Sequence, residues 1–391
     1  MDKMKLHRWI LLALWILSLV IVSFYGGAVS YGLFFCVTLL PAISFLYLIF
    51  VYRSFTLYQQ IESRNIVAGQ PQPYYFVLQN DSFFAFTSVS VKLFSSFSYV
   101  EKLPDGIVYE LLPGDKFPYE TKLVCRYRGE YEVGIKEILI TDFFRLFRLR
   151  YAVPGTIKAL VLPRIIRVKE LGSIADIPLL SRQVSAFTQT EPDSTVRNYM
   201  DGDALKQIHW KATARRQAFM VRNKTGEEKQ SISILCDTKR YYDDMKKYLP
   251  VENKILEILL ALGFFFAEKN IPFSLYYGQS GMVCHSVKEM NDFDAFYQNT
   301  ASIQFDKTED ARAILAQAMS TGSFRNNKIV FCILHAWDDS YDSLTAQLVS
   351  EGIIVVIYLI TEENPEDCLK QNSLRRRLIV LPVDAEPEGR L

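Results

Sequence analysis

The chain opens with a long apolar segment. No Asp, Glu, Lys or Arg occurs from Trp9 to Tyr52, and the run is broken only by the turn-forming pair Gly26-Gly27. A transmembrane helix needs about 20 apolar residues. The segment therefore predicts two membrane-spanning helices, at about 8–26 and 31–52, which make residues 1–55 a transmembrane hairpin.

Basic residues flank both ends of this segment: Lys3, Lys5 and Arg8 precede it, and Arg53 and Arg64 follow it. Because cytoplasmic flanks carry an excess of Lys and Arg, we expect both ends to face the cytoplasm and the hairpin to lie in a bacterial inner or plasma membrane. A cleaved signal peptide is the alternative, since the Lys-rich start, the apolar run and Ala28-Val29-Ser30 resemble its three regions. The second apolar span, which follows at once, favours the hairpin.

Residues 56–163 alternate apolar and polar positions in short segments such as YYFVLQN, TSVSVKLFSSFSYV and YETKLVCRYRGEYEVG. Turns such as LPDG and LPGD separate these segments. Alternation of this kind is typical of half-buried strands. Several such strands at regular spacing predict a β-sandwich, which would serve as a spacer or docking module.

From residue 231 the pattern changes to apolar strands that alternate with helices. This alternation predicts an α/β domain over 231–383 with a mostly parallel sheet, followed by a tail at 384–391. Sites in such sheets lie at the carboxyl ends of the strands. Those ends carry Asp237-Thr238-Lys239, Gly278-Gln279-Ser280 and His335-Ala336-Trp337-Asp338.

A connecting region at 164–230 holds a dense group of polar side chains in the segment Tyr199–Arg216, YMDGDALKQIHWKATARR. The preceding STVRNYM predicts an extended strand, Asp201-Gly202 predicts a turn, and Asp203 is a suitable helix N-cap. The next residues predict a helix from about Ala204, and FMVRNK after it is again expected to be extended. One apolar face of the helix would contain Leu205, Ile208 and Ala212.

Three roles fit this polar cluster. In the first, which we favour, Arg197 and Asp203 pair across Gly202, His209 bonds to either, and the cluster locks the helix to its strands. In the second, the cluster binds a partner protein or small ligand. Its contacts would be Arg197, Asp203, His209 and Arg215. In the third, Asp203 and His209 act in acid–base catalysis, for which the sequence offers no nucleophile or metal to complete the set.

Composition narrows the functional classes. The 391 residues carry 44 basic and 43 acidic side chains, so no global field favours nucleic acid. The six cysteines lack the spacing of a zinc site, and we expect them to be reduced and mostly buried. No GxxxxGK[ST] or GxGxxG phosphate loop is present, which argues against ATP hydrolysis by this chain.

The polar segment resembles the signature of a bacterial family known as domain of unknown function 58. Members show an R-x-Y, a G-D, an I-H-W and a T-A-R. The matching residues here are Arg197, Tyr199, Gly202-Asp203, Ile208-His209-Trp210 and Thr213-Ala214-Arg215. This central motif is specific, and the resemblance extends over the soluble chain and the paired spans.

A second resemblance to the same family lies upstream. Members carry R-G-x-Y-x-x-G, a strand and then D-P-F-G-L-F. The counterparts here are Arg128-Gly129, Tyr131 and Gly134, followed by Asp142-Phe143-Phe144-Arg145-Leu146-Phe147. Phe143 replaces Pro and Arg145 replaces Gly, so we expect a differently shaped turn.

The resemblance implies a membrane-tethered protein with a β-rich domain and a von Willebrand factor A-like domain. It also implies a MoxR-type AAA ATPase as partner, in cell-envelope or stress physiology. Because it implies no reaction, we expect a non-catalytic interaction or scaffold protein without a cofactor. An enzyme with its site at Asp203 and His209 is the alternative.

In the von Willebrand factor A fold, the first strand often ends in DxSxS, whose oxygens bind a divalent cation. Here Asp237 is followed by Lys239 and Tyr241 in place of the two serines. An ammonium beside the site would repel a cation, so we expect no bound metal. We expect Asp237 to cap the sheet edge or to pair with Lys239.

Basic residues are also concentrated in DFFRLFRLRYAVPGTIKALVLPRIIRVK, at 142–169. A solvated strand edge is the interpretation we favour. Contact with anionic lipid head groups is the alternative for a domain tethered close to the membrane.

Overall fold

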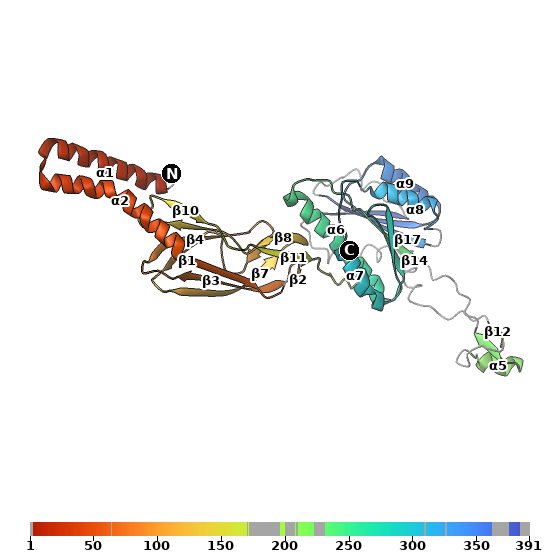
Figure 1. Ribbon diagram of the computed structural model, residues 1–391. Coiled ribbons are helices and arrows are strands. Elements are labelled where there is room, and N and C mark those ends of the chain that lie inside the picture. The colour runs from red at the N-terminus through yellow and green to blue at the C-terminus, as the bar shows by residue number, and fades with distance from the viewer. Residues whose placement is uncertain are drawn as a thin grey trace. The chain divides into compact units, whose positions relative to one another are not determined.

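The computed structural model describes residues 3–63, 65–169, 171, 196–199, 208, 210–222, 231–308, 310–324, 327–361 and 375–383 (Figure 1). The chain forms two compact units, Met1–Pro163 and Arg164–Leu391. The first unit contains a helical hairpin and a β-sheet-rich domain, and the second contains an α/β domain.

The hairpin consists of α1 (Lys3–Tyr25) and α2 (Gly27–Ser54), both long and apolar enough to cross a membrane. The helices are longer than the predicted spans, and their connection is shorter. Gly26 and Gly27 have φ angles of 58° and 90°, a left-handed conformation that glycine adopts without steric cost. The Gly-Gly break in the apolar pattern is therefore a tight turn, and the Trp15 indole N–H donates to Thr38 Oγ1 across the hairpin at 3.1 Å.

The β-sheet-rich domain follows α2 directly. Its strands are β1 (Phe55–Ile61), β2 (Asn65–Val67), β3 (Pro71–Asn80), β4 (Phe86–Leu93), β5 (Ser98–Val100), β6 (Ile107–Leu111), β7 (Lys116–Cys125), β8 (Gly129–Val133), β9 (Ile135–Thr141), β10 (Arg148–Tyr151) and β11 (Ile157–Leu162). Two four-stranded antiparallel sheets have the orders β1-β3-β7-β5 and β10-β9-β4-β6, and a third sheet has the order β2-β11-β8. Tyr74, Phe76 and Leu78 alternate along β3 and are buried, as the two-residue period predicts.

The R-G-x-Y-x-x-G segment forms a tight connection within this domain. The Tyr131 hydroxyl donates to the Tyr127 carbonyl at 2.7 Å. Gly134 has φ 83°, and a Cβ there would lie 2.9 Å from Gln59 Oε1 and 2.9 Å from Tyr74 Oη. Gln59 Oε1 accepts from the Tyr74 hydroxyl at 2.8 Å and from the Ile135 amide at 3.1 Å. Gly134 is thus required by both backbone conformation and space.

The turn after β9 is organised around the buried carboxylate of Asp142. This carboxylate accepts from the Phe147 amide at 2.6 Å, from the Phe144 amide at 3.1 Å and from the Ser44 hydroxyl of α2. Arg145 has φ 57°. This left-handed conformation is one that glycine adopts freely, so Arg145 occupies a backbone position suited to glycine.

The second unit contains a six-stranded sheet of order β16-β15-β14-β17-β18-β19. Its strands are β14 (Ser231–Cys236), β15 (Phe273–Gly278), β16 (Met282–Val287), β17 (Asn327–Leu334), β18 (Ile354–Ile360) and β19 (Arg376–Leu381). Of these six strands only β16 runs antiparallel to its neighbour, so the expected mostly parallel sheet is confirmed.

Helices pack on both faces of this sheet (Figure 1). They are α6 (Met245–Glu268), α7 (Phe293–Ala301), α8 (Ala311–Ser320) and α9 (Asp339–Ser350), with a 3-10 turn η2 at Met290–Asp292. Phe331 of β17 belongs to the core cluster under α6 and α7, whereas its neighbours Val330 and Cys332 belong to the cluster under α8 and α9. Burial on both faces explains why the strand sequences are continuously apolar.

Replacing Gly134 by Ala should destabilise the β-sheet-rich domain by about 2–5 kcal/mol, because a left-handed non-glycine residue costs about 1–2 kcal/mol and overpacking costs about 1–3 kcal/mol. Gly155→Ala is the matched control, since Gly155 has φ 78° but open space where a Cβ would lie. Denaturant unfolding of the full chain measures both costs. If Gly134→Ala is no more destabilising than Gly155→Ala, the steric part of this explanation is wrong.

Candidate functional site

The polar motif lies on a small set of elements in the second unit. Strand β12 (Val196–Asn198) pairs antiparallel with β13 (Met220–Arg222), and the short helix α5 spans Trp210–Arg216. Both strands were expected to be extended from the sequence. Arg197 lies in β12 with its backbone opposite Val221.

The predicted motif helix is wrong at Ile208. Ile208 forms an antiparallel bridge with Val221 and is buried, so it does not share a helical face with Ala212. The hydrophobic pattern was compatible with a helix from Ala204, but a β-branched residue also pairs well with a strand. The described helix α5 spans Trp210–Arg216, and the predicted site residues Gly202, Asp203 and His209 lie outside the residues that the structure describes.

Two motif residues bind their own neighbours. The Met220 amide donates to Thr213 Oγ1 at 3.0 Å, which ties α5 to β13. The Tyr199 amide donates to the Phe219 carbonyl at 2.7 Å, and the two rings lie 6.3 Å apart in an edge arrangement. These contacts hold the helix and the paired strands together.

Other motif residues face solvent. Trp210 is 67% exposed and Phe219 is 58% exposed, although aromatic rings of this size are usually largely buried. Arg215 of α5 is exposed as well, together with Lys211 and Arg216. We call Trp210, Lys211, Arg215, Arg216 and Phe219 the motif surface. It combines aromatic area with positive charge.

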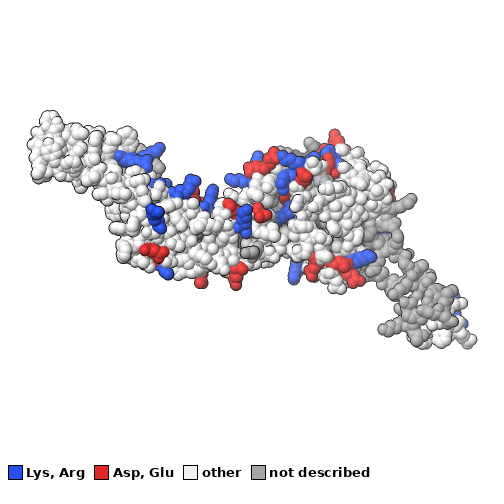
Figure 2. Space-filling model, viewed as in Figure 1, with Lys and Arg blue, Asp and Glu red and all other residues white. Residues whose placement is uncertain are grey.

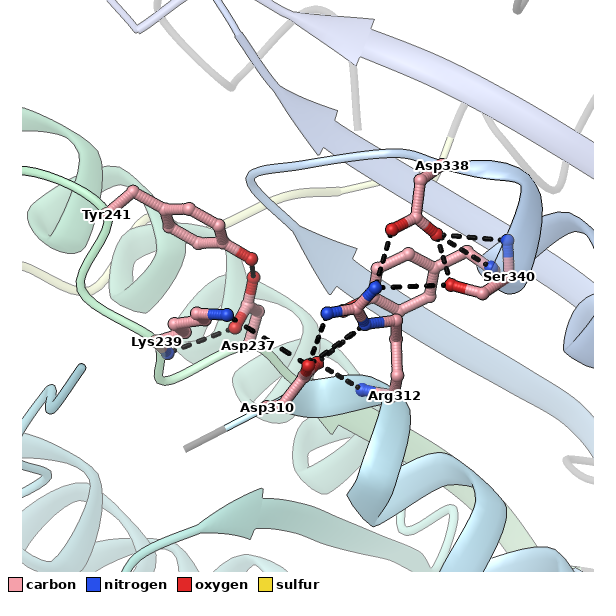
Figure 3. A network of polar contacts seen from close by, with 8 residues as sticks. Asp237, Lys239, Tyr241, Asp310, Arg312, Asp338 and Ser340 are labelled. Atoms are coloured by element: carbon pink, nitrogen blue, oxygen red, sulfur yellow. Dashed lines mark hydrogen bonds and ion pairs between the residues drawn. The ribbon is translucent and has the colours of Figure 1, made fainter. Parts of the chain in front are cut away.

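A second polar cluster lies at the carboxyl edge of the sheet (Figure 3). Asp237 follows β14 and is completely buried. Its carboxylate accepts from the Lys239 amide at 3.0 Å and from the Tyr241 hydroxyl at 2.9 Å. Burial raises the pKa of the Asp237 carboxyl above its usual range, against hydrogen bonds from Lys239, Tyr241 and the His335 backbone that lower it.

Arg312 is the centre of the remaining contacts. Its Nε lies 3.0 Å from both carboxylate oxygens of Asp310, and its Nη1 donates to Asp338 Oδ2 at 2.7 Å and to Ser340 Oγ at 3.3 Å. Asp310 and Asp338 are the N-caps of α8 and α9, where a carboxylate also satisfies free backbone amides. Figure 3 shows the guanidinium pointing between the two carboxylates. The network joins the starts of two helices.

Charge and hydrogen bonding shift both N-cap carboxyls in the same direction. Hydrogen bonds from Arg312 hold the pKa of Asp310 below its usual range. Burial raises the pKa of Asp338, but hydrogen bonds from Ser340 and Tyr341 and the charge of Arg312 outweigh it and lower the pKa overall. Asp237, whose pKa is raised, is therefore electrostatically unlike its two acidic neighbours.

Asp237 and Lys239 interact through the Lys239 backbone and not through the expected side-chain ion pair. Asp237 accepts from the backbone amide of Lys239, while the Lys239 ammonium lies 4.0 Å from Asp310. Within the described part of the chain, no three His, Cys, Asp or Glu side chains are grouped to hold a metal ion. Asp310 and Asp338 bind Arg312, whereas Asp237 accepts hydrogen bonds from an amide and a hydroxyl.

Sequence reasoning placed Asp237, His335 and Asp338 at this edge but missed Asp310 and Arg312. The available signal was the helix start at Asp310, where an acidic N-cap precedes an alanine-rich apolar pattern. The pairing of Arg312 with two separate N-caps depends on strand order, which the local pattern does not contain.

Three of the five described cysteines are buried and all five are free thiols.

Comparison with known proteins gives one family. A family model described as "Protein of unknown function DUF58" matches residues 195–276, a range that includes the motif, β14, α6 and most of β15. No curated protein matches the chain.

Similar solved structures are distant. An inactive mutant of a GH20 exo beta-N-acetylglucosaminidase from Vibrio harveyi is 8% identical, with 81% of this chain and 59% of that chain covered and a TM-score of 0.19. A beta-glucuronidase from Bacteroides uniformis is 12% identical, with 83% and 39% covered and a TM-score of 0.14. The chain thus spans less than two thirds of either protein, and TM-scores this low carry no structural argument.

The opposite pKa shifts at the carboxyl edge predict opposite effects of amide substitutions. The folded pKa of Asp237 is raised, so ionisation of this carboxyl lowers the stability of the wild-type protein as pH rises. Asp237→Asn cannot ionise, so its stability relative to wild type should increase as pH rises. The folded pKa of Asp338 is lowered, so its stabilisation is present at neutral pH and lost on acidification. Asp338→Asn should therefore destabilise most near neutral pH.

Urea unfolding of the full chain at about pH 4.5 and about pH 7.5 tests Asp237→Asn. Unfolding at about pH 3 and about pH 7.5 tests Asp338→Asn, because the stabilisation by Asp338 is lost only below the unfolded pKa of about 3.9. In the Asp237→Asn protein, the new side-chain amide retains an acceptor for the backbone amide of Lys239, and its NH₂ group can donate to the Tyr241 hydroxyl. Equal pH dependence in the two variants would contradict the assignment.

Proposed function

Because the chain belongs to the DUF58 family, we propose that it is a membrane-anchored interaction protein whose motif surface binds a MoxR-type AAA ATPase. The chain would act as a scaffold in cell-envelope or stress physiology, with its soluble parts in the cytoplasm. Its α/β domain would be von Willebrand factor A-like and would bind its partner without a metal.

The anchor supports a tethered role. Helix α2 ends at Ser54 and β1 begins at Phe55, so no linker separates the apolar helix from the first strand. Lys5 and Arg8 near the start of α1 and Arg53 at the end of α2 favour a cytoplasmic location for both ends. An ATPase partner belongs to the same compartment, since it needs ATP.

The exposure of Trp210 is the observation that carries the proposal. Trp and Arg are the residue types most enriched where binding energy is concentrated in protein interfaces. On the motif surface Trp210 is 67% exposed beside exposed Arg215, while Thr213 between them holds α5 to β13. Within one motif, one residue maintains the local fold and its neighbours present side chains to solvent.

The carboxyl edge supports a different role. Arg312 binds both Asp310 and Asp338, and Asp237 accepts hydrogen bonds from Lys239 and Tyr241. These contacts fix the helix starts relative to the strand ends. We therefore assign this edge to stability and the motif surface to partner binding.

The test is capture of the ATPase by the full chain. A MoxR-type AAA ATPase is co-expressed with the tagged protein, and the two are purified together from detergent-solubilised membranes. Trp210→Ala combined with Arg215→Ala should reduce capture at least about tenfold, because truncating a hot spot costs about 2 kcal/mol or more. The thermal midpoint should not change, since both side chains face solvent.

Tyr242→Ala is the control, because Tyr242 is a 40% exposed aromatic residue next to His335 at the carboxyl edge. Capture should survive this change. If Tyr242→Ala abolishes capture and the double variant does not, the partner binds the carboxyl edge and our assignment of surfaces is wrong. If wild-type protein captures no ATPase, the proposed partnership is wrong.

A further inference from the structure

An apolar groove of about 660 Å³ lies between α2 and two loops of the β-sheet-rich domain. From α2 it is lined by one helical face that includes Ile43, Tyr47 and Phe50, and from the loops by residues that include Phe84 and Phe144. The Phe50 and Phe84 rings lie 5.3 Å apart in an edge arrangement. The groove therefore has a membrane helix as one wall and the soluble domain as the other.

Both loops are fixed to α2 by hydrogen bonds. The Tyr47 hydroxyl donates to the Ala85 carbonyl at 2.5 Å, and the Ser44 hydroxyl donates to the buried carboxylate of Asp142. Asp142 in turn accepts from the Phe144 amide at 3.1 Å. These bonds set the height of the loops along the helix.

That height corresponds to the edge of the bilayer. The hydrocarbon core is about 30 Å thick and a helix rises about 1.5 Å per residue, so about 20 residues cross it. Counted from the turn at Gly26, about 20 residues of α2 end near Leu46. Tyr47 and Phe50 follow in the interfacial layer. The loop bound to Tyr47 lies in this layer, and the loop bound to Ser44 lies about 3 Å from it, two residues earlier along α2.

The loop side chains suit this layer. Phe83 is 91% exposed and Phe143 is 68% exposed, and aromatic residues are enriched where a membrane meets water. Two basic side chains lie at the turn that contains Phe143: Arg8 donates to the Leu146 carbonyl at 2.8 Å, and Arg145 is exposed. Figure 2 shows Lys and Arg gathered where the helical hairpin meets the β-sheet-rich domain.

We propose that this groove binds an anionic phospholipid of the adjacent leaflet. Its acyl chain lies along Tyr47, Phe50 and the loop phenylalanines, and its phosphate group faces the guanidinium groups of Arg8 and Arg145. The proposal requires that the hairpin anchors the chain in a membrane, but it does not depend on an ATPase partner. The continuity of the groove with a membrane-spanning helix identifies a bilayer lipid as the occupant.

The backbone at Arg145 supports this assignment. With φ 57°, Arg145 has a left-handed backbone conformation that is disfavoured for residues other than glycine. At this position Arg145 gives the loop a positive charge at the level of the lipid head groups. Replacement by glycine removes that cation without opposing the backbone conformation, so Arg145→Gly separates lipid binding from folding.

The test uses the full chain in bilayers that contain equal amounts of phosphatidylglycerol and phosphatidylcholine. In one preparation the phosphatidylglycerol carries brominated acyl chains, and in the other the phosphatidylcholine does. Phe143→Trp reports contact with brominated chains by loss of fluorescence. Tyr99→Trp is the matched control, because Tyr99 is 44% exposed and lies away from the groove. Its partner Val124 pairs with Pro71, at the opposite end of β3 from Asn80.

The Phe143→Trp protein should lose more emission than the Tyr99→Trp protein in both preparations, and the loss should be larger when phosphatidylglycerol is brominated. Adding Arg145→Gly should equalise the two preparations, and Arg145→Lys should preserve the difference. Quenching no stronger than in the Tyr99→Trp control would overturn the proposal, because the loops would then lie outside the bilayer. Equal quenching in the two preparations of the Phe143→Trp protein would overturn selectivity for the anionic lipid.

Discussion

The hydrogen bonds of the Asp142 carboxylate determine how the helical hairpin and the β-sheet-rich domain form one unit. This buried group accepts from two amides of its own turn and from Ser44 of α2. A buried carboxylate is costly unless its oxygens are satisfied. The turn, the helix and the strand that precedes the turn must therefore adopt their native arrangement together. The loops that border the apolar groove owe their position to this requirement.

The motif and the carboxyl edge show how neighbouring polar residues take different roles. Thr213 accepts a backbone hydrogen bond, whereas Trp210 three residues earlier faces solvent. At the carboxyl edge, Arg312 supplies positive charge to carboxylates that in other proteins can bind a cation. In both places, a residue that is hydrogen-bonded or ion-paired within the protein has a structural role, and a residue that faces solvent is available to a ligand.

Much of the fold follows from periodicity, and the rest depends on long-range pairing. The hairpin, the β-rich region and the parallel strands each produce a continuous local pattern. The antiparallel strand β16 and the helix α7 were not predicted. MVCHSV and FDAFYQNTA are short, although Phe293, Phe296 and Thr300 do recur at helical spacing. Ile208 was assigned to a helix because only its pairing with Val221 distinguishes a strand bridge from a helical position. For Arg312, the missing information was the adjacency of α8 and α9.

The order of strands in the α/β sheet has a consequence during synthesis. Central β14 pairs with β15 on one side and with β17 on the other, but β17 begins at Asn327 whereas β14 ends at Cys236. At about 5–20 residues per second, the ribosome needs roughly 5–20 s to supply that second neighbour. Until then an apolar strand edge is open to wrong partners. The helical hairpin precedes this domain in the sequence, so it is synthesised before this exposed intermediate forms.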